Sequence, residues 1–463
     1  MGQLAEAWKK IKPKVQAPPE WGIEPVSAEY RLLSFFDYVI LWGDLGVGLL
    51  VLLAGSFLVP GLGLGSALLA ILVGSVVGAL MLSLIGMLGS RTALPTMVLL
   101  RPALGLRGSY LPSVLNVLQL VGWTIFEFVL MGYAANALSK TLFGASNLIF
   151  WTMIFAGLVI LMGLGGPLSV VRQWLKKFAV WVMLATTLWM TWRLLTSVNL
   201  IALFNKPGNG SLTFWAGVDL VIAMPISWLP IVADYSRFAK KTSHAFWGTF
   251  VGFAVTNIWF YALGAVILLT TSISPEPKEF VSGLMLTAGW VAFLILLLDE
   301  TDNAWADLYS AAVSLQNVLP KVKQRWLILG LGVLSFVIAV LLDITQYQNF
   351  LYLIGSIFTP LFGLLAADYF VLRRQRYQPD EMLRPRGAYW LQNGVNLCGA
   401  IAWVFGIAIY NITAPYTLGA FIPQWLDIVP PSFTLYGASI PSFAAAFVVY
   451  AALGFVFLKN SKH

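Results

Sequence analysis

The chain has 463 residues, of which 59% are hydrophobic and only 10% are charged, and its formal net charge is +8. Soluble domains carry about 25% charged residues, so this composition excludes a soluble globular protein, which needs more polar surface to cover its core. The sequence therefore predicts an all-α polytopic membrane protein. The single cysteine, Cys398, excludes an internal disulfide. The polar, basic N-terminus has no early apolar region, so we expect no cleavable signal peptide.

Twelve segments satisfy the length requirement for a transmembrane helix, which is about 20 mostly apolar residues. No soluble domain of any size is left between them. We expect these spans near residues 35–58, 64–89, 110–138, 147–166, 178–199, 214–236, 245–270, 282–315, 326–344, 348–372, 390–412 and 437–458.

The Lys and Arg residues indicate the orientation, because cytoplasmic loops carry an excess of them. With the N-terminus in the cytoplasm, nearly all of the 28 Lys and Arg residues fall in cytoplasmic segments. The exceptions are Lys140, Arg193, Lys206 and Lys278. The positive charge thus faces anionic lipid of the inner leaflet. It does not indicate a nucleic acid partner, and we expect both termini in the cytoplasm of a plasma membrane protein.

Spans 1 and 6 both contain residues that interrupt helices. In span 1, glycines at positions 43, 46 and 48 surround Asp44 near the middle of the membrane, and glycine weakens a helix. In span 6, Pro225 and Pro230 each remove a backbone donor. Broken helices at corresponding places in two halves indicate a transporter's binding site. The alternative is that these residues only permit close packing or kinks.

Span 3 carries Trp123 and Glu127, which are four residues apart and therefore share a helix face. An indole can stack on a flat polar ring, and a carboxylate can accept its N–H groups. Ordinary packing is the alternative for Trp123, and a structural ion pair is the alternative for Glu127. Gln119, from the same stretch "NVLQLVGWT", is a further candidate substrate contact.

Span 8 reads "LLLDETDNAWADLY" and places several carboxylates inside the membrane. A charged residue at the middle of a span costs about 2.5–3.5 kcal/mol on insertion scales, so a function is the default interpretation. Asp299 and Asp302 are three apart and share a face. We expect Glu300 to point elsewhere, with or without a structural partner, and Asp307 either to line the inner vestibule or to bond locally. Asp44 either faces a cation or caps the half-helix that follows.

Two further acids, Asp234 and Asp368, lie in "ADY" segments near the cytoplasmic ends of spans 6 and 10. We interpret them as structural, capping helices or pairing with Arg237 and Arg373.

Four motifs in order resemble the nucleobase:cation symporter-1 family. They are "GSRTALPTMVLLRPALGLRGSYLPSVLN" between spans 2 and 3, "VADYSRFAKK" after span 6, "LYSAAVSLQN" in span 8 and "LIGSIFTPLFGLLAADYFVLRR" in span 10. Ala93 and Leu104 depart from the usual Gly and Phe. The stretches "NVLQLVGWT" and "SWLPIVADY" are most similar to the cytosine and hydroxymethylpyrimidine branch.

The resemblance implies a LeuT-type fold with two five-helix inverted repeats. The expected parts are a cytoplasmic segment over 1–34, a ten-helix core over 35–372, a cytoplasmic loop over 373–389, and two added spans with a short tail over 390–463. It also implies cation-coupled uptake of a flat nitrogen heterocycle by alternating access.

Family roles for the substrate then fall on particular residues. The stacking tryptophan falls on Trp123, and the family's Gln one turn later falls on Glu127, a departure. A substrate-lining position of span 1 falls on Val47, with Gly43 beside it. The span 6 substrate segment falls near Ser227 and Trp228.

Family roles for the cation fall on spans 1 and 8. The span 1 carbonyls fall on Gly43 and Gly46, and the span 8 carbonyl falls on Asp299. The two cation-binding hydroxyls of sodium-coupled members fall on Asp302 and Asn303. Asp302 would put a formal charge into the site, which suits either bound sodium or a proton taken up by a buried carboxylate. Asp302 is therefore our coupling candidate, with Asp44 also in the coupling set.

Other functions are less well supported by the residues. Clustered acids could hold Mg²⁺, or paired aspartates could serve proteolysis. However, no basic residue stands near the acids to hold a pyrophosphate, and no His, Cys or Ser–His pair offers a nucleophile. We expect a transporter and not an enzyme, with no cofactor besides the coupling ion and no required protein partner. Cytosine, hydroxymethylpyrimidine, uracil, a purine, allantoin or a hydantoin would all suit a stacking slot.

Overall fold

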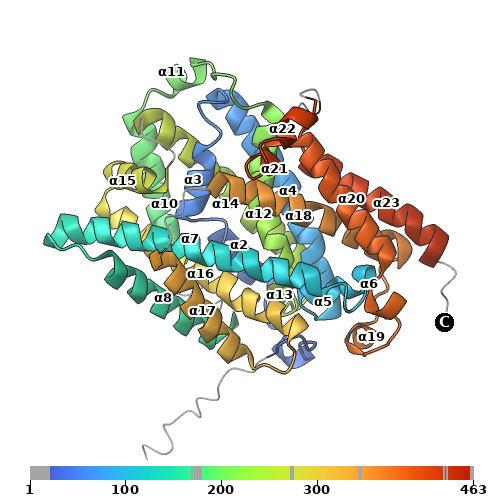
Figure 1. Cartoon of the computed structure of the whole chain (residues 1–463). Coiled ribbons are helices and arrows are strands. Elements are labelled where there is room, and N and C mark those ends of the chain that lie inside the picture. Colours follow the sequence, from blue (N-terminus) through green and yellow to red (C-terminus); the bar gives the residue numbers. More distant parts are fainter. Residues whose placement is uncertain are drawn as a thin grey trace, which may run out of the picture.

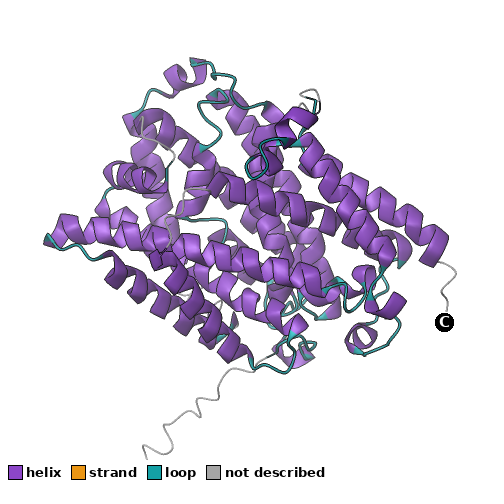
Figure 2. Ribbon diagram, in the orientation of Figure 1, coloured by secondary structure: helices purple, strands orange, loops and turns teal. Residues whose placement is uncertain are grey.

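The computed structural model describes residues 21–167, 170, 180–271, 276–341, 347–430, 433 and 436–458. In this part of the chain, helices are joined by loops, with an isolated bridge between Leu33 and Ala239 (Figure 2). The predicted all-α class is therefore confirmed. The first 20 residues of the expected N-terminal segment and the end of the expected tail lie outside the described residues.

The long helices are α4 (Leu64–Thr92), α7 (Tyr110–Phe143), α8 (Leu148–Gly165), α10 (Val180–Ser197), α12 (Phe214–Trp228), α14 (Thr242–Thr271), α15 (Pro277–Ala288), α16 (Trp290–Val318), α17 (Gln324–Leu341), α18 (Tyr347–Ala366), α20 (Leu397–Thr413) and α23 (Ser439–Leu453). The shorter helices are α2 (Phe35–Asp44), α3 (Leu49–Ser56), α5 (Thr96–Leu99), α6 (Arg101–Leu104), α11 (Leu200–Asn205), α13 (Val232–Ser236), α19 (Pro379–Leu383), α21 (Tyr416–Gly419) and α22 (Trp425–Ile428).

Eight of the described helices are long and apolar enough to cross a membrane, or nine when the bent pair α2 and α3 counts as one span. A polytopic membrane protein is thus confirmed. The three remaining predicted spans fall on α10, α16 and α20, which are shorter or more polar than the others. The count of twelve and the inverted repeat stay predictions.

The helices pack in three groups (Figure 1). The broken pair α2 and α3 lies against α14, which with α12 also packs on α4. The long α7 runs along α16, with α8 and α17 on the same side. On the other side, α18, α20 and α23 form a group of their own. Any site at the break in span 1 is therefore enclosed by α7, α12 and α16.

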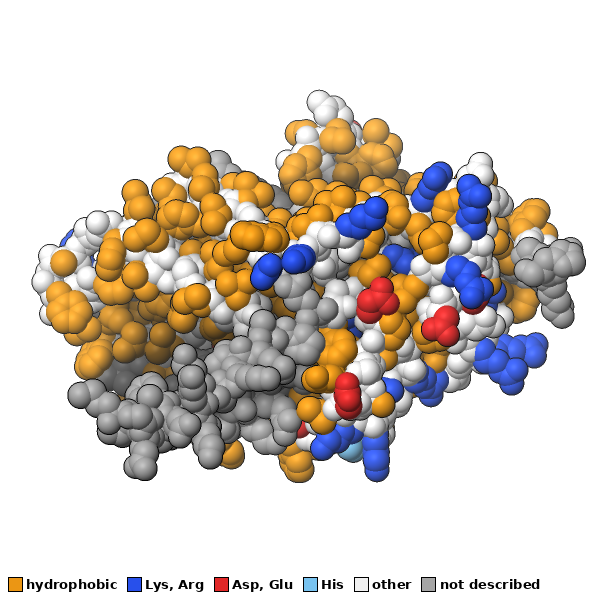
Figure 3. All heavy atoms as spheres, turned by 90° about the horizontal axis from the view of Figure 1, so that it is seen from below, with side chains coloured by type: hydrophobic (Ala, Val, Ile, Leu, Met, Phe, Trp, Pro, Cys, Tyr) orange, Lys and Arg blue, Asp and Glu red, His pale blue; other side chains and the backbone are white. Residues whose placement is uncertain are grey.

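Basic side chains gather on one face of the molecule. Figure 3 views the structure from below and shows Lys and Arg concentrated over one part of that face, which carries α5, α6 and α19 in Figure 1. The orientation predicted from the Lys and Arg residues stays a prediction.

The predicted interruption of span 1 is present. Helix α2 ends at Asp44, α3 begins at Leu49, and the two are bent by 60°. Gly48 has a φ of +155°, and a Cβ there would lie 2.9 Å from the Glu300 Oε2 atom. Because such backbone conformations are essentially restricted to glycine, this residue is required both by its conformation and by its neighbour on α16.

The break in span 6 lies at Pro230 and not at Pro225. Pro225 is inside the continuous helix α12, where its ring packs at Gly78; a Cβ at position 78 would lie only 2.1 Å from the Pro225 Cγ atom. The irregular turn is the 3₁₀ segment Leu229–Ile231. Pro225 was expected as a possible helix breaker, but α12 continues through it, and its ring packs against Gly78 of α4.

The expected span over 282–315 is two helices. Helix α15 ends at Ala288, Gly289 has a φ of +81°, and α16 begins at Trp290. The left-handed glycine stops the first helix, so the acids of "LLLDETDNAWADLY" lie in the first two-thirds of α16.

The Gly48→Ala variant should be less stable than the wild type. Alanine at this φ costs on the order of 1–3 kcal/mol, and its Cβ meets Glu300. Gly157→Ala is the matched control, because nothing lies within 4 Å of a Cβ at this helical position. Thermal unfolding in detergent should show a lower apparent Tm for Gly48→Ala only. Equal unfolding temperatures for the two variants would contradict the role assigned to Gly48.

Candidate functional site

A small cavity lies where span 1 is broken, between α3, α7, α12 and α16. We call it the tryptophan cavity. Its chemically distinctive lining residues are Trp123, Glu127, Trp228, Glu300, Asn303 and Asp307. Among the described residues, no Lys, Arg, His or Cys lines it.

Two indoles form aromatic walls of this cavity. Trp123 on α7 is held edge-on by Phe350 and Tyr347, with ring centroids 5.2 and 5.7 Å away. Trp228, at the end of α12, lies edge-on to Trp42 at 6.1 Å. Edge-to-face packing fixes both rings in place. In the described structure, neither indole Nε1 atom has a hydrogen-bond partner, and both are buried.

Helix α16 holds both sides of the break in span 1. The backbone N–H of Leu49, at the start of α3, donates to Glu300 Oε2 at 2.6 Å. The Asn303 Nδ2 atom donates to the carbonyl oxygen of Val47 at 2.9 Å. A carboxylate at a helix N-terminus is stabilised by the unsatisfied N–H groups and the helix dipole. Glu300 thus tethers the half-helix α3 to α16.

Glu300 and Asp307 were not assigned to a binding site from the sequence, yet both line the tryptophan cavity. Residues 300, 303 and 307 follow the i, i+3, i+7 spacing of one helix face. That spacing was the available signal. It was obscured because Asp299 and Asp302, on a different face, matched family positions.

A second acidic cluster, the aspartate triad, lies on that other face. Carboxylate oxygens of Asp44, Asp299 and Asp302 lie within 4.8 Å of one another, and all three residues are buried. Within the described chain, the carboxylate oxygens of Asp44 and Asp299 have no hydrogen-bond partner. Buried like charges at this separation require a proton or a cation between them. Asp44 therefore faces the acids of α16.

Three residues predicted at the sites have further neighbours in span 1. Gly43 and Val47 line a separate apolar cavity between α2, α10 and α14. Gly46 packs against α14, since a Cβ there would lie 2.2 Å from the Thr256 Oγ1 atom. The carbonyl oxygen of Val47 accepts a hydrogen bond from Asn303, and Val47 is not among the residues that line the tryptophan cavity.

Asn303 also differs from its expected placement beside Asp302. Successive residues of a helix point about 100° apart, so Asp302 joins the triad while Asn303 lines the tryptophan cavity. The two positions that the resemblance assigns to one cation site are thereby divided between two sites.

Gln119 positions span 6. Its Nε2 atom donates to the Ser227 carbonyl oxygen at 3.0 Å and to Asn116 Oδ1 at 2.8 Å. The Ser227 hydroxyl donates to the carbonyl of Met224 at 2.6 Å. Ser227 lines the cavity, with its hydroxyl already engaged, and Gln119 fixes the backbone behind it.

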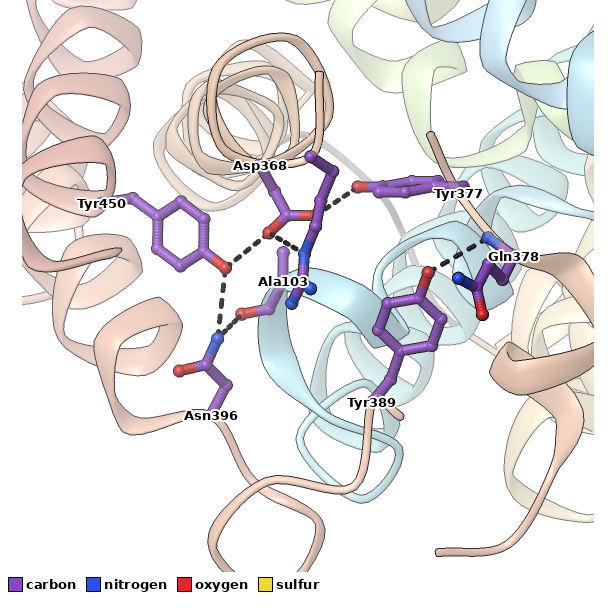
Figure 4. Close-up of polar contacts among 8 residues, drawn as sticks. Ala103, Asp368, Tyr377, Gln378, Tyr389, Asn396 and Tyr450 are labelled. Carbon is purple, nitrogen blue, oxygen red and sulfur yellow. Dashed lines mark hydrogen bonds and ion pairs between the residues drawn. The ribbon is translucent and has the colours of Figure 1, made fainter. Parts of the chain in front are cut away.

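The two "ADY" acids take structural roles. Asp234 accepts the backbone N–H of Thr96 at 3.0 Å. Asp368 accepts the hydroxyls of Tyr377 and Tyr450 at 2.7 and 2.8 Å and lies 3.7 Å from Arg373 (Figure 4). This network connects the end of span 10 to α23 and to the loop before α19.

A family model described as permease for cytosine/purines, uracil, thiamine, allantoin matches residues 25–428. Among curated relatives, the hydantoin permease of Microbacterium maritypicum is 24% identical over 84% of this chain and 83% of its own. The allantoin permease of Bacillus subtilis (strain 168) is 24% identical over 89% and 91%. The cytosine permease of Escherichia coli (strain K12) is 25% identical over 77% and 83%. Because these identities are nearly equal, the branch within the family stays a prediction.

Solved structures of similar fold include Mhp1, a nucleobase-cation-symport-1 family transporter, in a closed conformation with bromovinylhydantoin bound. It gives a TM-score of 0.79 over 96% of each chain at 19% identity. The inward facing conformation of Mhp1 gives 0.75 over 96% of this chain and 95% of its own, also at 19% identity. A Na⁺-coupled sialic acid symporter gives 0.63 at 12% identity over 96% and 93%. These likenesses confirm the predicted LeuT-type transporter fold.

Proposed function

This chain belongs to the family of permeases for cytosine/purines, uracil, thiamine and allantoin, and from that premise we propose that it imports a flat nitrogen heterocycle by cation-coupled symport. Its relatives are permeases of hydantoin, allantoin and cytosine, so the chain is a transporter and not an enzyme. In this proposal, the tryptophan cavity binds the heterocycle and the aspartate triad binds the coupling cation, with alternating access between the two sides of a plasma membrane.

The observation that carries the proposal is the arrangement of two sites on one helix. Helix α16 presents Glu300, Asn303 and Asp307 to the tryptophan cavity, and Asp299 and Asp302 to the triad. The break in span 1 touches both, through Asp44 on one side and the Leu49 N–H on the other. A cation that neutralises the triad therefore favours one geometry of the break, and the same geometry forms the cavity. Binding of ion and heterocycle is then linked reciprocally.

Sodium and a proton both suit the triad chemically. Carboxylate oxygens bind hard cations, and a carboxyl group that shares a proton with its neighbour relieves the repulsion between like charges. With several carboxylates present, the site differs from a neutral cage of carbonyls and hydroxyls. We propose that Asp302 and Asp299 act together with Asp44, and that both termini lie in the cytoplasm. No cofactor and no protein partner is required by this scheme.

Uptake into proteoliposomes tests the proposal. Cytosine, uracil, allantoin and hydantoin should first be screened by thermal shift in detergent, with and without sodium. The best ligand, radiolabelled, should then accumulate above its external concentration under an inward ion gradient. Coupling to a proton predicts a response to an imposed pH gradient without sodium. Coupling to sodium predicts uptake that saturates with sodium. Equilibration without accumulation under both gradients would contradict symport and indicate a channel.

Trp123→Ala should weaken binding of that ligand by on the order of 1–3 kcal/mol, the range for stacking of a base on an aromatic side chain. Trp247→Ala is a matched control, since this tryptophan is exposed on α14, away from the cavity. Isothermal titration in detergent measures the two affinities. An affinity of folded Trp123→Ala equal to that of the control would show that Trp123 does not stack on the ligand.

A further inference from the structure

The tryptophan cavity is rich in hydrogen-bond acceptors that the protein itself leaves unused. Its donors are largely engaged: Asn303 Nδ2 bonds the Val47 carbonyl, and the Ser227 hydroxyl bonds the Met224 carbonyl. Glu127 Oε2 and Asn303 Oδ1, in contrast, are buried without a partner in the described structure. The free donors on the walls are the two indole N–H groups.

Two carboxylates line this cavity from two helices that pack against each other. Glu127 comes from α7 and Asp307 from α16, and their charges are close enough to interact. Glu300, the third carboxylate of the lining, is already engaged with the Leu49 N–H. Because no cationic side chain among the described residues lines the cavity, the compensating positive charge and the missing donors must come from a proton, an ion or the ligand.

We propose that the ligand is a heterocycle with an amidine edge, bound as a cation across Glu127 and Asp307. An amidine edge is an exocyclic amino group beside a ring nitrogen, as in an aminopyrimidine. When protonated, it offers parallel N–H donors that match a carboxylate, and such charge-assisted pairs are about twice as strong as neutral ones. The ring lies against Trp123. This inference rests on the proposed function and specifies its substrate class.

The same balance of donors and acceptors in the tryptophan cavity disfavours a ring that carries two carbonyl groups. The oxygens of uracil or hydantoin would face carboxylate oxygens, and each unpaired buried acceptor costs about 1–3 kcal/mol. A site that receives parallel N–H groups discriminates against a ring whose N–H lies between two carbonyl oxygens, as in uracil or hydantoin, because the acceptors of the site are then left unpaired. Selection thus follows from the number of donors on the ring edge and not from ring size.

Binding of three pyrimidines of equal ring size tests this inference: 2,4-diaminopyrimidine, cytosine and uracil. Isothermal titration of the full-length protein in detergent, at one fixed pH and salt concentration, should give affinities that fall in that order. The first and last should differ by about tenfold or more, or about 1.4 kcal/mol. Asp307→Asn and Glu127→Gln should each shrink this ratio. Asp380→Asn, the same chemical change at an exposed position of α19, should preserve it.

The outcomes of these titrations distinguish a failure of the amidine-edge inference from a failure of the proposed function. If uracil or hydantoin binds as tightly as 2,4-diaminopyrimidine, the amidine-edge inference is overturned while the proposed function stands. If both folded variants keep the wild-type ratio, Glu127 and Asp307 do not read the ligand edge, and the inference is likewise overturned. If no pyrimidine, hydantoin or allantoin binds the wild type, the proposed function falls with it.

Discussion

Negative charge buried in the membrane interior is the constraint on which this structure depends. An uncompensated carboxylate there costs several kcal/mol, and this chain concentrates six around one break in one helix: Asp44, Glu127, Asp299, Glu300, Asp302 and Asp307. Glu300 is compensated within the protein, at the N-terminus of α3. Among the described residues, no Lys, Arg or His lines the cavity that holds Glu127 and Asp307, and the three carboxylates of the aspartate triad lie close together. The fold therefore buries negative charge that, in the proposed function, a transported ion and a transported ligand compensate.

In the proposed function, the geometry of α16 links the cation site to the ligand site. Its two acidic faces meet the same four-residue break, and we propose that a change in charge on one face shifts the backbone that borders the other. The glycine at position 48 makes the close approach possible, since a Cβ would lie 2.9 Å from the Glu300 Oε2 atom. Edge-to-face aromatic packing holds Trp123 and Trp228 in the cavity walls. Linkage then requires no contact between ion and ligand.

Sequence reasoning recovered the features that follow from composition and local chemistry. Hydropathy indicated a polytopic membrane protein, which the eight or nine long apolar helices of the described residues bear out, and Gly48 and Pro230 lie in the breaks expected for spans 1 and 6. Sequence reasoning did not show which neighbouring helices the residues around those breaks face. Gly43 is still part of α2, but past Asp44 the backbone is no longer helical, so periodicity could not show that Val47 also lines the cavity beside α10 and α14. Their assignment to the substrate site came from resemblance alone.

Two other differences have equally specific causes. The division of the predicted span 8 into two helices depends on the positive φ of Gly289. The sequence contains 41 glycines, and nothing in it indicates which of them adopts such a conformation. The separation of Asp302 from Asn303 is a consequence of helical geometry, available from the sequence once α16 is taken as a regular helix. The i, i+3, i+7 spacing of Glu300, Asn303 and Asp307 was likewise visible in the sequence. It predicts the lining of the tryptophan cavity better than the positions taken from the family resemblance do.

The central claim is that charge in the aspartate triad couples ion movement to ligand movement. Asp302→Asn removes one charge and keeps the side-chain shape, so it tests the claim most directly. In proteoliposomes, the variant should still exchange internal for external labelled ligand, but should no longer accumulate it under the ion gradient that drives the wild type. Accumulation by Asp302→Asn at the wild-type level under that gradient would contradict the account.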